Sequence, residues 1–132
     1  MARVTTIIVA LYILFNLAIA ATLIFDPSQL DRTYRGGVMT PTREFLWFSV
    51  ASFHLLVVAV AIVALRMRRA AERRWIVLAN AGFYLWDALT QWLYWGAHVG
   101  LAPVDLHVNA GVSAGCGALL IFAAWRDRDP AA

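Results

Sequence analysis

Apolar residues fall into four long runs, and short segments that carry most of the charged residues separate them. Each run approaches the ~20 residues that a helix needs to cross the hydrocarbon core of a bilayer. We therefore predict membrane spans over residues 5–25, 42–65, 75–97 and 106–125. Because short links join neighbouring spans, we expect an all-α, polytopic membrane protein. Its four transmembrane helices would form an up-down bundle, a single domain over residues 1–132.

Local signals mark several ends of these spans. The Asp26-Pro27 pair follows the first run and favours a turn, so the first helix should stop there. Thr40 is placed to cap the second helix, and Pro41 suits its first helical position. The fourth helix should begin between Pro103 and His107.

The third run differs from the others because it carries polar residues at steps of three or four. At roughly 100° per residue, these positions fall within about 40° of one line, so one face of the helix is polar along its whole length. An ionisable side chain is costly in hydrocarbon, so the aspartate of this stripe should face the interior of the bundle. The stripe consists of Asn80, Tyr84, Asp87, Gln91, Tyr94 and His98.

The other spans also place polar side chains near mid-membrane. Asn16 and His54 lie next to the centres of the first and second spans, while Ser113 and Cys116 flank the centre of the fourth. If the bundle closes, these side chains converge on Asp87. A lone cysteine excludes an intrachain disulfide, and we interpret Cys116 as a small core residue.

His54 and Asp87 form the candidate catalytic pair. A histidine oriented by a carboxylate is a common acid-base device, so we interpret them as a pair that handles protons. The alternative is that the polar side chains hydrogen-bond one another and only fix the packing of the helices.

An interior walled by aromatic residues with a few polar groups is typical of sites for flat or elongated apolar molecules, such as quinones, sterol-like or isoprenoid compounds. The leading hypothesis is a membrane protein that binds a small, largely apolar, lipid-like molecule above a polar floor. The sequence names no cofactor. The predicted ligand-binding residues are Asn16, Asn80, Tyr84, Gln91, Asn109 and Ser113.

Three other functions fit the same stripe. One is an acid-base enzyme, namely an isomerase, cyclase or hydrolase acting on a lipid-soluble substrate, with Asp87 as the proton carrier. Another is a small proton-coupled transporter. The last is an accessory subunit of a larger membrane complex.

Composition and charge support the membrane assignment and orient the chain. Of its residues 62% are hydrophobic and 14% charged. All basic residues are arginines, and five of them crowd into 66–74, which indicates a topology signal and not a nucleic-acid site. Counting both ends gives eight arginines against three, so we expect a bacterial-type inner (plasma) membrane with both termini cytoplasmic.

The sequence contains two further, weaker patterns. Gly111, Gly115 and Ala118 form a ridge of small residues opposite Ser113, which favours close approach of a neighbouring helix in the bundle or, alternatively, of a second copy in a homodimer. His98, Asp105 and His107 carry metal-ligating groups, but their spacing matches no metal motif, so we predict no metal site.

Overall fold

The computed structural model describes residues 3–28, 39–95 and 103–127, without the side chains of 94–95 and 103–106. This part of the chain is helical and contains no strand, as predicted. Its elements are α1 (Arg3–Phe25), α3 (Pro41–Arg66), α4 (Ala70–Thr90), the π-helical turn η1 (Gln91–Trp95) and α6 (Pro103–Arg126).

The predicted end signals act as expected. α1 ends directly before Asp26. The Thr40 side chain accepts a hydrogen bond from the Arg43 backbone N–H at 3.3 Å, and Pro41 opens α3. α1 therefore ends at the predicted Asp-Pro turn. α3 begins where Thr40 satisfies one backbone donor and Pro41 lacks another.

The third span differs from its prediction at both ends. α4 begins at Ala70, five residues before the predicted start at 75, because Glu72 lies in its first turn and pairs with Arg69 at 3.3 Å. At the other end, the α-helix stops at Thr90 and widens into η1. A single π-helical turn within a helix often marks a functional site.

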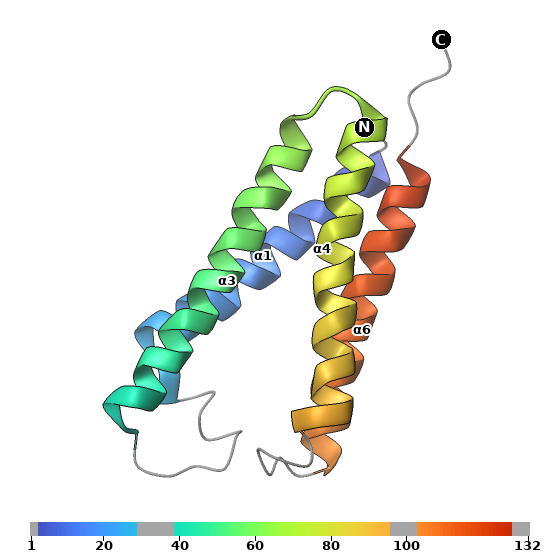
Figure 1. Cartoon of the computed structure of the whole chain (residues 1–132). Helices are drawn as coiled ribbons and strands as arrows, with labels where there is room; N and C mark the ends of the chain where they lie inside the picture. Colours follow the sequence, from blue (N-terminus) through green and yellow to red (C-terminus); the bar gives the residue numbers. More distant parts are fainter. Residues whose placement is uncertain (1–2, 29–38, 96–102, 128–132) are drawn as a thin grey trace.

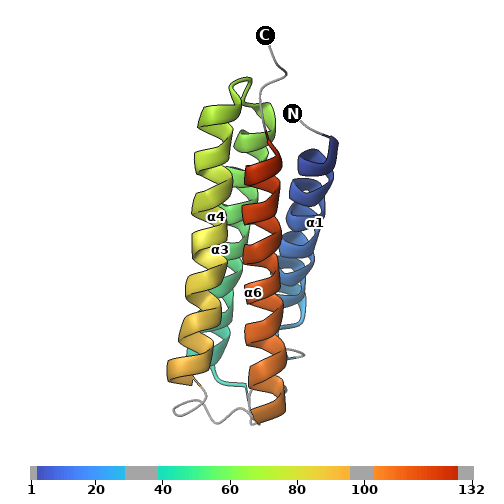
Figure 2. The ribbon, with the colours of Figure 1, turned by 90° about the vertical axis from the view of Figure 1, so that its right-hand side faces the viewer.

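The helices form two pairs that meet at one end and diverge toward the other. The start of α1, the end of α6 and the α3–α4 connection lie at the same end (Figure 1). α4 packs along α6 and α1 packs along α3, with fewer contacts between the pairs. Figure 1 shows α3 and α4 close at the connection and spread apart at their other ends, and in the turned view of Figure 2 α4 and α6 run side by side in front of α3.

Small residues close the end where the pairs meet, which we call the closed end. Its buried side chains include Ala61, Ala64 and Ala123, and small side chains allow helices to approach closely. The Thr5 hydroxyl donates to the Ala123 carbonyl at 3.1 Å, joining α1 to α6. The Arg73 guanidinium holds the Asp127 carboxylate at 2.5 and 2.8 Å, joining α4 to the end of α6.

Three helices are long and apolar enough to cross a membrane: α1, α3 and residues His107–Arg126 of α6. Large apolar side chains such as Leu11, Leu56 and Leu119 point outward from them, which suggests a membrane protein. α4 does not meet the same criterion within the described residues, because its polar stripe and the charged residues of its first two turns lower its hydropathy.

The closest helix contact of a described α6 glycine does not lie at the predicted ridge of small residues. A Cβ added to Gly111 or Gly115 would meet nothing within 4 Å, so the prediction that these glycines pack against a neighbouring helix of the bundle is wrong. The close approach occurs at Gly117, where a Cβ would lie 2.8 Å from Leu85 and 3.3 Å from the Ala81 carbonyl oxygen. The spacing of small residues identified α6 as a packing helix but selected the wrong face.

Candidate functional site

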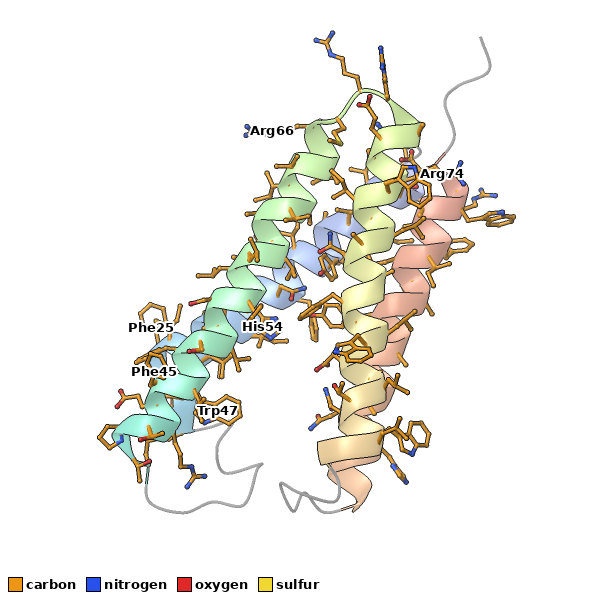
Figure 3. The ribbon with its side chains drawn as sticks, in the orientation of Figure 1. Phe25, Phe45, Trp47, His54, Arg66 and Arg74 are labelled. Carbon is orange, nitrogen blue, oxygen red and sulfur yellow. The ribbon has the colours of Figure 1, made fainter. Side chains whose placement is uncertain are left out.

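A pocket of about 500 Å³ lies between the diverging helix pairs, lined by residues from α1, α3, α4 and α6 and by Gln91 of η1. Aromatic side chains form much of its wall, and in Figure 3 His54 and Trp47 lie on the side of α3 that faces α4. The polar lining residues are His54, Tyr84, Asp87, Gln91, Asn109 and Ser113, all of which the sequence analysis selected.

Asn16 lies behind the pocket wall and bonds to two of the side chains that form it. Its side chain is completely buried. Its Oδ1 lies 2.7 Å from the Nδ1 of His54 and accepts a hydrogen bond from the Tyr84 hydroxyl at 2.7 Å. Its Nδ2 donates to the Tyr12 carbonyl at 2.8 Å. One amide therefore ties α1 to α3 and α4 and fixes the orientation of two pocket side chains.

Asn80 also lies behind the pocket. Its Oδ1 accepts a hydrogen bond from the Tyr12 hydroxyl at 2.9 Å, and its Nδ2 donates to the Ile76 carbonyl at 3.0 Å. Neither Asn80 nor Asn16 lines the pocket, although both were predicted to contact ligand. Asn16 bonds directly to two lining residues, whereas Asn80 bonds to Tyr12, whose ring packs edge-on against that of Tyr84.

Asp87 is held by a separate set of hydrogen bonds. Its Oδ2 accepts from the Ser113 hydroxyl at 2.7 Å and from the Gln91 Nε2 at 2.6 Å. The carboxylate thus faces the interior and joins α4 to α6, as predicted from the polar stripe. The Oε1 of Gln91 is buried with no hydrogen-bond partner among the described residues.

His54 and Asp87 line the same pocket without touching each other. Within the described residues, no hydrogen bond or ion pair joins them, and each is oriented by its own partners, Asn16 for the imidazole and Ser113 with Gln91 for the carboxylate. A molecule in the pocket could contact both. The geometry is that of two groups facing a shared space and not of a directly bonded dyad.

The Arg73–Asp127 contact was not predicted from the sequence. Arg73 was interpreted only as a topology signal, but its side chain is 2% exposed, and its guanidinium also donates to the Met67 carbonyl at 2.6 Å. The signal was present, because Arg73 lies seven residues before Asn80 and so extends the polar face of α4 by two turns.

The predicted rim residues lie partly outside the described part of the chain. His98 and the side chain of Asp105 are not described, and neither is the side chain of Tyr94. The His107 ring lies 5.4 Å from that of Trp92. Among the described residues, no group of three or more potential metal ligands gathers.

Comparisons with known proteins give no family: no protein-family model, curated protein or solved structure matches this chain. The assignment of a function therefore depends on the pocket itself.

Proposed function

We propose that the protein is a four-span up-down membrane bundle that binds a small, largely apolar molecule in the pocket between its helix pairs. The observation that supports this is the pocket of about 500 Å³, with an aromatic wall and a polar floor that includes His54 and Asp87. Small-molecule sites are usually concave, mostly apolar and equipped with a few fixed polar groups, and their volumes fall in the same range.

The orientation of α4 supports its place as the fourth span. Its polar face is turned inward, where Tyr84 is buried and Asp87 bonds to Ser113. Its opposite face exposes Trp86 and Leu89, as a surface in contact with lipid would.

The arginines support a membrane orientation. Arg66 and Arg74 lie at the closed end, beside the α3–α4 connection (Figure 3). By the positive-inside rule this end, with both termini, faces the cytoplasm of a bacterial-type inner membrane. The pocket then lies between mid-membrane and the outer surface, and His54 and Asp87 exchange protons with its occupant or with water.

A pocket-filling substitution tests the binding function. Val50 lines the pocket on α3, whereas Val63 is exposed on the same helix. Val50→Trp should empty the pocket, and Val63→Trp is the matched control on the lipid-facing surface. Native mass spectrometry of protein released from nanodiscs should detect a bound small molecule in the wild type and in Val63→Trp, but not in Val50→Trp. Equal occupancy of the two variants would refute the proposal.

The same two side chains favour an acid-base enzyme as a second candidate, because both face one pocket from different helices and can reach one molecule. In this case the molecule recovered after incubation differs from the one supplied. Conversion that persists in both Asp87→Asn and His54→Ala would exclude this candidate.

A further inference from the structure

The hydrogen bonds around the pocket fix which polar atoms remain for a ligand. The amide orientation of Asn16 is determined because its Nδ2 donates to the Tyr12 carbonyl at 2.8 Å. Its Oδ1 can only accept, so the Nδ1 of His54, 2.7 Å away, must carry the proton of that hydrogen bond. In the neutral imidazole, the Nε2 of His54 is then an acceptor, and no described residue donates to it.

The carboxylate end of the pocket has the same polarity. The donors of Ser113 and Gln91 both point to the Oδ2 of Asp87, at 2.7 and 2.6 Å. No described residue donates to the other oxygen, Oδ1. The Oε1 of Gln91 is buried without a partner, although a buried amide oxygen is normally satisfied.

Two acceptors are therefore available at the pocket, Nε2 of His54 and Oδ1 of Asp87, and the unpartnered Oε1 of Gln91 is buried beside them. The Tyr84 and Ser113 hydroxyls already donate to Asn16 and Asp87, and the N–H donors of the lining belong to Trp47, Asn109 and the residues named above. The described lining contains no arginine, and the chain contains no lysine. A quinone or a fatty acid would bring further acceptors to these atoms, and a fatty acid would also bring like charge to the carboxylate.

The wall complements a positive charge as well. Phe15, Trp47, Phe53 and Phe83 line the pocket. Aromatic faces attract organic cations, and the attraction increases when water is excluded. An apolar body bearing a protonated amine would place the ammonium at the acceptors and the body against these rings.

We propose that the occupant of this pocket is an amphiphilic organic cation, a protonated amine on an aromatic or aliphatic body, whose N–H groups donate to Asp87 and His54. This inference depends on the proposed binding function and names its ligand class. The ammonium neutralises the carboxylate, and no described lining residue is an arginine that could do so.

Three probes with one ring system and different charge test the proposal: 1-naphthylmethylamine, 1-naphthylmethanol and 1-naphthaleneacetate. Binding is measured by equilibrium dialysis near neutral pH in nanodiscs of zwitterionic lipid, with empty nanodiscs as the correction for partition into lipid. The wild type should bind the amine at least about tenfold more tightly than the alcohol, and the carboxylate most weakly. A preference for the alcohol or the carboxylate would overturn the proposal without requiring any variant.

Asp87→Asn removes the charge but keeps an oxygen that accepts from Ser113 and Gln91, so the local fold is retained. In this variant the advantage of the amine over the alcohol should shrink to about twofold or less, while Val63→Trp should keep it in full. An unchanged advantage in Asp87→Asn would overturn the proposal.

The experiment also separates this inference from the proposed function. Suppose that the alcohol binds saturably to the wild type but not to Val50→Trp, and that its affinity equals that of the amine. The pocket then binds apolar molecules, and only the charge of the proposed ligand is wrong. If no probe binds saturably to the wild type, both proposals fail.

Discussion

The two ends of the helix assembly contain similar kinds of residue but use them differently. At the closed end, polar groups bond directly from helix to helix: Thr5 to the Ala123 carbonyl and Arg73 to Asp127. At the end where the pairs diverge, hydrogen bonds such as that from Ser113 to Asp87 also join helices, but aromatic side chains line a pocket there, and Gln91 Oε1 has no partner within the described residues.

The difference teaches how a small helical assembly can keep a pocket between its helices. Close contact between small residues and a buried ion pair stabilise one end, so the other end does not need to be filled by its own side chains. Stability and binding are then separable by substitution. Changes at the closed end should affect unfolding most, and changes at the pocket should affect binding most.

The largest expected effect is loss of the Arg73–Asp127 pair. Asp127→Ala leaves a guanidinium in a site where the side chain is 2% exposed, and removal of one partner of a buried pair typically costs about 3–5 kcal/mol. Unfolding in mixed micelles of increasing dodecyl sulfate content, followed by circular dichroism, measures this loss of stability.

The exposed pair Arg69–Glu72 provides the control. Its side chains are 81% and 53% exposed, so Glu72→Ala should cost less than about 1 kcal/mol. The double variant Arg73→Leu/Asp127→Leu should recover most of the loss of Asp127→Ala, since it leaves no unpaired charge. Equal effects of Asp127→Ala and Glu72→Ala would show that the closed end is not held by this pair.

The next effect concerns the contact between α4 and α6. A Cβ on Gly117 would lie 2.8 Å from Leu85, so Gly117→Ala should destabilise the protein by about 1–3 kcal/mol through overpacking. Gly115→Ala meets nothing within 4 Å and should be neutral or stabilising by up to about 1 kcal/mol, because alanine favours the helix. The same micelle titration compares them, and a reversed order would contradict the packing described for α6.

Much of this arrangement was predictable from the sequence. Helix positions follow from run length and from end signals such as Thr40 and Pro41, and these acted as expected. The period of three and four in the third run correctly placed Tyr84, Asp87 and Gln91 on the interior face, because helical geometry fixes which residues share a face.

The sequence could not predict which helix faces pack against each other. The spacing of Gly111 and Gly115 marks a face but not the partner of that face, and the partner depends on how α4 and α6 are rotated against each other. For the same reason, the similar predicted depth of His54 and Asp87 suggested that the two residues form a pair, whereas His54 bonds to Asn16 and Asp87 bonds to Ser113.

The boundary between the two regions can be tested at Asn16. Asn16→Leu deprives the His54 N–H and the Tyr84 O–H of their common acceptor, which should destabilise the protein by about 1–3 kcal/mol. It should also weaken binding of the amine probe, because the imidazole is no longer oriented. Ser52→Ala removes only an exposed hydrogen bond within α3 and should change neither quantity. Loss of stability without loss of binding would assign Asn16 to packing alone.

The smallest effect is expected from Thr5→Val, which keeps the side-chain shape but removes the hydrogen bond to the Ala123 carbonyl. This carbonyl also accepts from the Asp127 backbone N–H at 3.0 Å, so it does not become unsatisfied. The expected loss is therefore about 0.6 kcal/mol, typical of hydrogen bonds between membrane helices. Thr22→Val removes an exposed hydrogen bond within α1 and serves as the control with no expected loss.

The same substitution also tests whether the two contacts of the closed end are coupled. In Asp127→Ala the loss of stability caused by Thr5→Val should be larger than in the wild type, because both contacts hold the same turn of α6 against its neighbours. Strict additivity would mean that the closed end consists of two independent contacts and not of one cooperative unit.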